Sequence, residues 1–416
     1  MANTRALVIG GSMGGMIAAH LLRAVGWDAV IFERNGTDLI SRGAGIGTHS
    51  ALLEILRRIG IVFDDAMGVV VDTVICLDRD GRIVREHPTV RTMSSWAQLY
   101  NSLRTRLPDG SYRLGKALQR IEQDPNGVTA VFADNTRERG DLLIGADGIR
   151  STVRAQVLPD VQPSYAGYVG WRVMIDEADI PPAVHRDVFE SYSFCLPDGE
   201  MLLGYPVPGR NNETQAGQRA YNIVWYRPVE PDALVDLCTD AQGRLHAGGI
   251  PPPLIRPELI AALEAQARAI VAPQIAEIVA RSRPFFQPIY DLVSPRITFG
   301  RVALMGDAAF VVRPHLGAGV TKAALDAESL ADALREHGAD LDAALARYQR
   351  QQQPFGSGMV ALAQKEGAYL SARSKPPGQR SLAERTRNVD SVLDSHTIQR
   401  ESVKQLIAER ERRARP

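Results

Sequence analysis

A glycine-rich segment near the N-terminus constrains the fold of this chain more than any other feature. Gly10-Gly11-Ser12-Met13-Gly14-Gly15 follows an apolar stretch at Arg5–Ile9 and precedes helical spacing of apolar residues over Met16–Val25. A second apolar stretch, Asp28–Phe32, comes next. Strands that are apolar on both faces are typical of a parallel sheet covered by helices. The order strand, glycine turn, helix, strand therefore predicts a βαβ unit of a doubly wound α/β fold.

The same segment fits the dinucleotide pattern G-x-G-x-x-G, with Ser12 at the second glycine position. The first glycine permits a tight turn, and the free N–H groups at the start of the helix can bind a pyrophosphate. Glu33 ends the second strand, where a carboxylate can accept hydrogen bonds from ribose hydroxyls. We predict that the cofactor-binding residues of this unit are Gly10, Ser12, Met13, Gly14, Gly15, Glu33 and Arg34. The pattern alone does not distinguish NAD from FAD.

Charge and composition exclude several classes of partner. The chain of 416 residues has 48 basic and 48 acidic residues, and this zero net charge argues against nucleic acid as a partner. No apolar run reaches the ~18 residues of a membrane span, so none is expected. Cys76, Cys195 and Cys238 are far apart in the sequence and have no metal-binding spacing. We therefore expect no metal site, reduced thiols and a cytoplasmic protein.

The chain is long enough for two or three structural units. Strand-like spacing dominates from Tyr165 to Phe286, which predicts a mostly antiparallel second domain. A strand at Arg301–Met305 and a helix at Val320–Arg335 then return to the cofactor-type pattern. We predict a discontinuous first domain made of residues 1–165 and 288–370. The second domain comprises residues 166–287, and the hairpin at 72–90 joins it. Residues 371–416 form a C-terminal helical extension. In the extension, a helix over Ser381–Arg412 is expected to lie outside the catalytic unit, against the first domain or a second subunit.

Two further segments resemble the paired motifs of flavoprotein aromatic hydroxylases of the para-hydroxybenzoate hydroxylase type. They are Gly145-Ala146-Asp147-Gly148 and Gly306-Asp307-Ala308-Ala309, each of which follows an apolar strand. Three other segments are similar to those of dihydroxypyridine hydroxylases: Tyr165–Arg172, Tyr205–Arg210 and Arg313–His315. The resemblance implies a Rossmann-type FAD-binding first domain, a second domain that covers the substrate, and NADH or NADPH as co-substrate.

By the same resemblance, Asp307 accepts a hydrogen bond from a ribityl hydroxyl of FAD, and Pro314 lies beside the flavin ring. Gly317, Ala318 and Gly319 then open a helix whose N–H groups can stabilise negative charge on the flavin. Asp147 belongs to the other motif. The sequence departs from the family pattern at Lys322, where many members have asparagine, and at Trp96, where arginine is usual. Candidates for the missing contact are Arg42, Gln98 and Arg104.

The implied reaction is hydroxylation of a small hydroxylated aromatic or N-heteroaromatic ring by molecular oxygen, which adds to C4a of the reduced flavin. A deprotonated ring hydroxyl activates the attacked carbon, and either His49 or His315 is a candidate base because imidazole titrates near neutral pH. Pro314 completes the catalytic loop. Trp171, Tyr205, Trp225 and His315 are the predicted substrate-binding residues. A carboxylated substrate would instead require an arginine clamp, for which Arg172 and Arg313 are candidates.

Other functions remain open at this point. FAD motifs do not name the electron acceptor, so an oxidase or a reductase of related fold is an alternative. A non-catalytic flavoprotein and an NAD-dependent dehydrogenase are further alternatives. The sequence also leaves open whether the protein is a homodimer.

Overall fold

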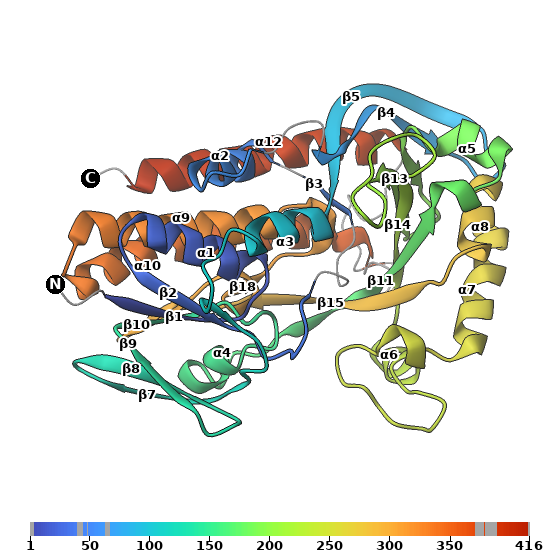
Figure 1. Ribbon diagram of the computed structural model, residues 1–416. Coiled ribbons are helices and arrows are strands. Elements are labelled where there is room, and N and C mark those ends of the chain that lie inside the picture. The colour runs from blue at the N-terminus through green and yellow to red at the C-terminus, as the bar shows by residue number, and fades with distance from the viewer. Residues whose placement is uncertain are drawn as a thin grey trace.

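The computed structural model describes residues 4–39, 45–47, 49–62, 67–370, 378 and 389–414, and in the last helix it describes side chains for residues 401–413. Two large sheets hold most of the strands, and a smaller sheet of three strands lies against the first. Figure 1 shows the two large sheets at opposite ends of the molecule, with β11 (Ser164–Asp176) and β15 (Phe285–Val293) running between them.

The first sheet has six strands in the order β16-β17-β10-β1-β2-β6. All neighbours pair in parallel except β16 and β17. The loops that follow β1, β10 and β17 therefore meet at one edge, which is where doubly wound folds bind their ligands. The strands are β1 (Arg5–Ile9), β2 (Asp28–Phe32), β6 (Tyr112–Arg113), β10 (Leu142–Gly145), β16 (Thr298–Phe299) and β17 (Val302–Leu304).

Three helices cover one face of this sheet, namely α1 (Met13–Ala24), α9 (Gly319–His337) and α10 (Leu341–Glu366) (Figure 1). The contact between α1 and α9 is close and is lined by the small residues Gly14 and Ala323. A Cβ on Gly14 would lie only 3.2 Å from the Cβ of Ala323. This close approach sets the distance between the glycine turn at one end of α1 and the loop that precedes α9.

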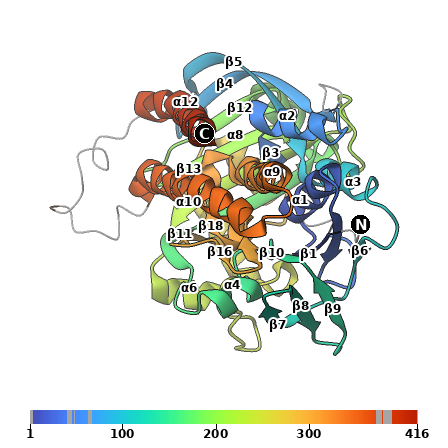
Figure 2. The same ribbon diagram turned by 90° about the vertical axis from the view of Figure 1, so that its left-hand side faces the viewer.

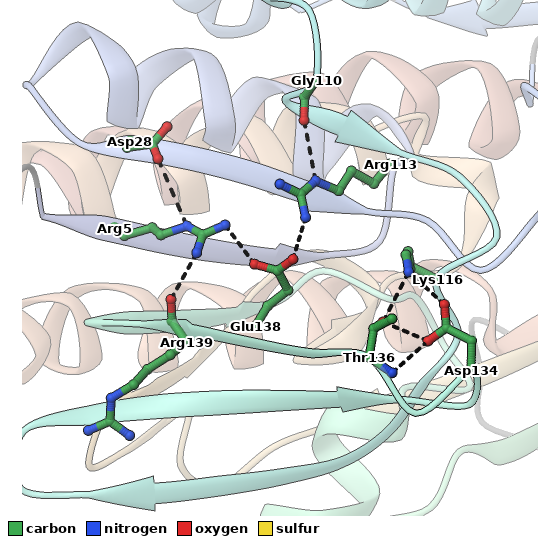
Figure 3. Close-up of polar contacts among 9 residues, drawn as sticks. All are labelled: Arg5, Asp28, Gly110, Arg113, Lys116, Asp134, Thr136, Glu138 and Arg139. Atoms are coloured by element: carbon green, nitrogen blue, oxygen red, sulfur yellow. Dashed lines mark hydrogen bonds and ion pairs between the residues drawn. The ribbon is translucent and has the colours of Figure 1, made fainter.

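The three-stranded sheet comprises β7 (Leu118–Asp124), β8 (Gly127–Phe132) and β9 (Arg137–Gly140). Figure 3 shows the polar side of its contact with the first sheet, where the carboxylate of Glu138 lies between Arg5, at 2.7 Å, and Arg113. Ion pairs on a surface contribute about 0–1 kcal/mol each. Apolar packing therefore holds this sheet, as the ring of Phe132, which is fully buried and 4.8 Å from that of Phe32, illustrates.

The second large sheet has nine strands in the order β18-β15-β11-β14-β13-β12-β4-β5-β3. Its pairs are antiparallel except that of β12 with β4. The hairpin predicted around Asp80-Gly81 is formed by β4 and β5. The remaining strands and this hairpin are β3 (Gly45–Gly47), β4 (Val69–Leu77), β5 (Ile83–Ser95), β12 (Tyr192–Cys195), β13 (Met201–Val207), β14 (Ala220–Pro228) and β18 (Phe310–Val311).

Helices interrupt the region from Tyr165 to Phe286, where mostly strand-like spacing was expected and no helix was predicted. α7 (Pro257–Ile270) and α8 (Pro273–Ala280) both begin with proline at a first helical position and are rich in Ala, Leu, Ile, Glu and Gln. Proline at that position and these residue types favour helix, so the signal was present in the sequence. The shorter elements of this region are η3 (Glu177–Asp179), α5 (Pro182–Val188), α6 (Pro231–Leu237) and η4 (Pro252–Leu254).

The C-terminal helix α12 (Val389–Ala414) lies beside α10, as Figure 2 shows. Val403 is buried, and Arg410 donates a hydrogen bond to the carbonyl oxygen of Leu325 in α9 at 2.7 Å. The predicted C-terminal helix is thus present and packs on α9 and α10, although its predicted start at Ser381 lies outside the described residues. The other elements are α2 (Ser50–Arg58), α3 (Trp96–Arg104), α4 (Thr152–Val157), η5 (Gly306–Ala308) and η6 (Pro314–Leu316).

Candidate active site

The glycine turn between β1 and α1 requires glycine at two positions. Gly10 has φ of +108°, and a Cβ there would lie 2.4 Å from the carbonyl oxygen of Ala146 in the loop after β10. A Cβ on Gly15 would lie 2.0 Å from the carbonyl oxygen of Gly10. Ser12 is the N-cap of α1 and is exposed. The start of the helix therefore faces open space, where its N–H groups can bind an anion.

A cavity of about 520 Å³, the nucleotide cleft, opens at this turn. The predicted cofactor residues that line it are Gly10, Ser12, Glu33, Arg34 and Asp147, whereas Met13, Gly14 and Gly15 lie behind the turn. The two oxygens of Glu33 accept hydrogen bonds from the backbone N–H of Gly11, at 2.8 Å, and of Asn35, at 2.9 Å. These bonds fix the carboxylate at the end of β2, where a ribose would meet it.

Asp147 has a structural role as well as a place in the cleft. It accepts hydrogen bonds from the backbone N–H of Thr152, at 2.7 Å, and from the hydroxyl of Ser151, and so holds the start of α4. Burial raises the pKa of this carboxyl group. Arg154 in the same helix is buried and donates to the carbonyl oxygen of Ala308 at 3.1 Å. The two motifs that carry the family resemblance are thus joined by one side chain.

Two of the candidates for the missing arginine contact, Gln98 and Arg104, line neither cavity. Arg104 donates to Asp38 at 3.2 Å and stacks on the ring of Tyr112, and it lines neither this cleft nor the second cavity described below. Gln98 lines neither cavity, although its buried Oε1 has no hydrogen-bond partner among the described residues. Arg42 lies outside the described residues. Trp96, which stands where the family usually has arginine, lines the cleft together with Lys116, whose position gave no signal in the sequence.

A second cavity of about 420 Å³, the ring cavity, lies between the loops that lead into α9 and the nine-stranded sheet. Seven predicted residues line it, namely His49, Tyr205, Asp307, Pro314, His315, Gly317 and Gly319. Ala318 is the N-cap of α9 and is buried behind them. Gly317 has φ of +61°, a left-handed conformation that glycine adopts readily. This turn aims the start of α9 at the cavity.

A buried ion pair supports the turn that carries Asp307. Lys322 donates to Asp326 at 2.8 Å and to the carbonyl oxygen of Gly306 at 3.0 Å, and both charged side chains are buried. Asp326 also accepts from the backbone N–H of Gly306 at 2.9 Å. The turn thereby presents the exposed carboxylate of Asp307 to the ring cavity. Sequence reasoning noticed Lys322 as a departure from the family pattern but missed Asp326, which lies one helical turn later.

The two candidate bases come from different parts of the cavity wall. The Nε2 atom of His315 lies 3.1 Å from the carbonyl oxygen of Ala363, and it must donate because that oxygen can only accept. Its Nδ1 atom faces the hydroxyl of Tyr168 at 3.5 Å. His49 is the N-cap residue of α2 and is half-buried at the cavity wall. His315 is therefore held from both ring nitrogens.

The two tryptophans predicted to bind substrate lie on the opposite face of the sheet. Trp171 and Trp225 are cross-strand partners, and both are buried in the core beneath α7 and α8. The indole nitrogen of Trp225 donates to Glu200 at 2.8 Å. Because side chains alternate along a strand, their neighbours Arg172, Val224 and Tyr226 face the ring cavity. The aromatic wall of the cavity is formed by tyrosines, namely Tyr192, Tyr205 and Tyr226.

Comparisons with known proteins agree with this architecture. A family model described as FAD binding domain-like matches residues 165–291. The curated 2,6-dihydroxypyridine 3-monooxygenase of Paenarthrobacter nicotinovorans is 30% identical over 91% of this chain and 95% of its own length. Aurachin C monooxygenase/isomerase of Stigmatella aurantiaca is 31% identical, covering 82% and 83%. The solved structure of 2,6-dihydroxypyridine-3-hydroxylase from Arthrobacter nicotinovorans has a TM-score of 0.83 at 29% identity, covering 91% of this chain and 95% of that one.

The parallel sheet with its glycine turn, together with the covering antiparallel sheet, defines a flavoprotein of the hydroxylase type. The chain belongs to the family of FAD-dependent aromatic monooxygenases, the class A flavoprotein hydroxylases. The resemblance noted in the sequence is confirmed. FAD is its cofactor, and NADH or NADPH is the co-substrate typical of the family. Within the described part of the chain, no helix combines the length and apolar character that crossing a bilayer requires.

Proposed function

We propose that this protein hydroxylates a small, hydroxylated N-heteroaromatic ring, a pyridinol, or failing that a simple phenol. The ring cavity is the main support for the proposal, because its volume of about 420 Å³ and its tyrosine walls suit a flat aromatic compound of one or two rings. The relative named 2,6-dihydroxypyridine 3-monooxygenase, which matches 91% of this chain, supports a pyridine ring over a benzene ring.

The residues of the nucleotide cleft fit the adenosine end of FAD. The close backbone packing at Gly10 and Gly15 and the open start of α1 suit a pyrophosphate. The fixed carboxylate of Glu33 suits a ribose. Asp307 lines the ring cavity, and we assign it the acceptor of a hydrogen bond from the ribityl chain. Bound FAD supplies the activation of molecular oxygen that no side chain can supply.

Residues of this chain orient the substrate and keep water away. Pro314 and His315 form the loop on one side of the ring cavity, and Tyr205 and Tyr226 form the sheet side. A closed, largely apolar site protects reactive intermediates from water. His49 and His315 are the titratable side chains of this wall that could exchange a proton with the substrate.

The finer organisation is also part of the proposal. We assign residues 1–165 and 288–370 to the FAD-binding domain, 166–287 with the 72–90 hairpin to the substrate domain, and 371–416 to a helical extension. The three cysteines are free and buried, which supports a cytoplasmic location. A homodimer stays an expectation that sedimentation of the FAD-loaded protein would test.

The test is a panel of hydroxylated pyridines and benzenes, scored for both NAD(P)H consumption and oxygenated product. We expect pyridinols to raise NAD(P)H oxidation well above the basal rate and to yield a hydroxylated product. Oxidation without an oxygenated product would favour the alternative of an oxidase or a reductase. Conversion of only a long-chain quinol or a fused polycyclic phenol would contradict the substrate class while leaving the family unchanged.

A further inference from the structure

The ring cavity is lined by an arginine, Arg172, to which the resemblance to the hydroxylase family gave no role. Arg172 projects from β11 into the cavity and is half-buried there. Among the described residues it makes no hydrogen bond or ion pair, in contrast to Arg313, which donates to Asp291 at 2.7 and 2.8 Å and lines no part of the cavity. A half-buried guanidinium without a counter-ion is costly, and it suits a carboxylate or another anionic oxygen.

Two tyrosine hydroxyls accompany this guanidinium. Tyr205 on β13 and Tyr226 on β14 line the same wall, and Arg172 is a charged neighbour of both. Burial raises the pKa of Tyr226 to about 12 and that of Tyr205 further, and it outweighs the lowering effect of Arg172 in each case. Both hydroxyls therefore remain protonated near neutral pH. The hydroxyl of Tyr226 can donate a hydrogen bond to an anion that Arg172 attracts, whereas that of Tyr205 donates to the carbonyl oxygen of Gly45 at 3.4 Å.

The other groups that face this wall do not neutralise it. Arg91 of β5 adds a second cation above the ring of Tyr192, at 4.9 Å. His49 and His315 line the cavity from α2 and from the loop before α9. Asp307 is the only carboxylate among the described lining residues, and it belongs to the turn assigned to FAD. Among the described residues, no carboxylate of the sheet side therefore offsets the charge of Arg172.

The hydrogen bonds of His315 argue against it as the base, and Arg172 offers another way to activate the substrate. A base must present a free lone pair to the substrate, but Nε2 of His315 donates to Ala363 and Nδ1 faces the hydroxyl of Tyr168. We propose that the substrate binds already ionised, as a mono-anion whose negative oxygen lies against Arg172 and the hydroxyl of Tyr226. This inference rests on the proposed function. The proton leaves the ring hydroxyl for water, and Arg172 offsets the charge that remains.

The experiment uses FAD-loaded protein and 2,6-dihydroxypyridine under anaerobic conditions, so that binding is observed without turnover. Absorption of the bound ring is recorded at a pH below the pKa of the free compound. We expect the spectrum of the ionised form, and an apparent Kd that rises about tenfold for each pH unit below that pKa, since only the anion binds.

Variants then assign the effect to the residue. Arg172→Gln should weaken binding about 30-fold or more and abolish the spectrum of the ionised form, because it leaves the anion unpaired. Arg172→Lys should restore part of both. Arg210→Gln, which removes an exposed arginine 83% accessible to solvent, is the matched control and should change neither. Bound FAD and the melting temperature of each variant verify that the protein is folded.

The outcomes separate the two proposals. If the wild-type protein hydroxylates the pyridinol but binds it with the spectrum of the neutral form, the inference fails and the proposed function stands. Wild-type affinity and pH profile in Arg172→Gln would also overturn the inference. If the wild-type protein neither binds nor converts any pyridinol, both proposals fail.

Discussion

The nucleotide cleft and the ring cavity are built in different ways. In the cleft, backbone atoms approach so closely that only glycine fits at Gly10 and Gly15, and most of the lining comes from short runs at the ends of parallel strands, such as 9–12, 32–35 and 146–148. In the ring cavity, the walls come from side chains of β5, β11, β12, β13, β14 and the loops before α9. A change in the cleft should therefore remove the cofactor, whereas a change in the cavity should alter substrate binding or turnover while FAD stays bound.

The largest expected effect is that of Gly15→Val. A Cβ at this position would lie 2.0 Å from a backbone oxygen, and a backbone atom cannot move aside as the end of a flexible side chain can. We expect protein with no detectable bound flavin, measured by absorption after gel filtration with excess FAD. Gly36→Ala is the control, because a Cβ there meets no atom within 4 Å. Full flavin occupancy in Gly15→Val would show that the glycine turn does not form the cofactor site.

Lys322→Met tests the support beneath the Asp307 turn. The substitution leaves Asp326 buried without its counter-charge, which typically costs about 3 to 5 kcal/mol of folding stability. Denaturant unfolding of the FAD-loaded protein measures this loss. The double variant Lys322→Met, Asp326→Asn should recover much of the stability, since it removes the charge and keeps an acceptor for Gly306. A loss below about 1 kcal/mol in the single variant would contradict the importance of the pair.

Asp307→Ala tests a residue that lines the ring cavity but is expected to bind the cofactor. If its carboxylate accepts a ribityl hydroxyl, its removal should weaken FAD binding by roughly 1.5 to 3 kcal/mol, or about 10- to 150-fold in Kd. Flavin fluorescence on titration of the apoprotein measures this change. Asp160→Ala is the control, because Asp160 is exposed and lines neither cavity. Unchanged FAD affinity in Asp307→Ala would make the residue structural only.

The smallest effect is predicted for His315→Gln. Glutamine keeps an N–H donor for the carbonyl oxygen of Ala363 but removes the imidazole. A general base typically contributes about 100- to 10,000-fold to a rate, so a base role predicts a large loss of turnover. We expect kcat within about tenfold of the wild-type value, with FAD retained, because the hydrogen bonds of His315 position the loop. A loss of more than 100-fold would restore His315 as the base and weaken the argument for an ionised substrate.

The contrast between the two regions also explains what the sequence could reveal. The glycine turn, Glu33 and the strand and helix around them follow from local rules, so β1 and β2 were predicted at the bounds that the structure shows. Side chains of the cavity depend on which face of a strand points inward, and a shift of one residue exchanges the faces. Sequence reasoning therefore selected Trp171 as a cavity residue, whereas its neighbour Arg172 occupies the cavity. The contact of Arg154 with Ala308 spans distant segments and could not be predicted either.

The measurement that tests the account most directly follows the oxygen atom. FAD-loaded protein is supplied with NAD(P)H, a pyridinol and isotopically labelled dioxygen, and the product is examined by mass spectrometry. We expect one labelled oxygen atom in each molecule of hydroxylated product, with NAD(P)H consumed in equal amount. Two results would contradict the assignment as a monooxygenase. One is labelled hydrogen peroxide as the only oxygen-containing product across the whole panel of pyridinols and phenols. The other is a hydroxylated product whose new oxygen comes from water.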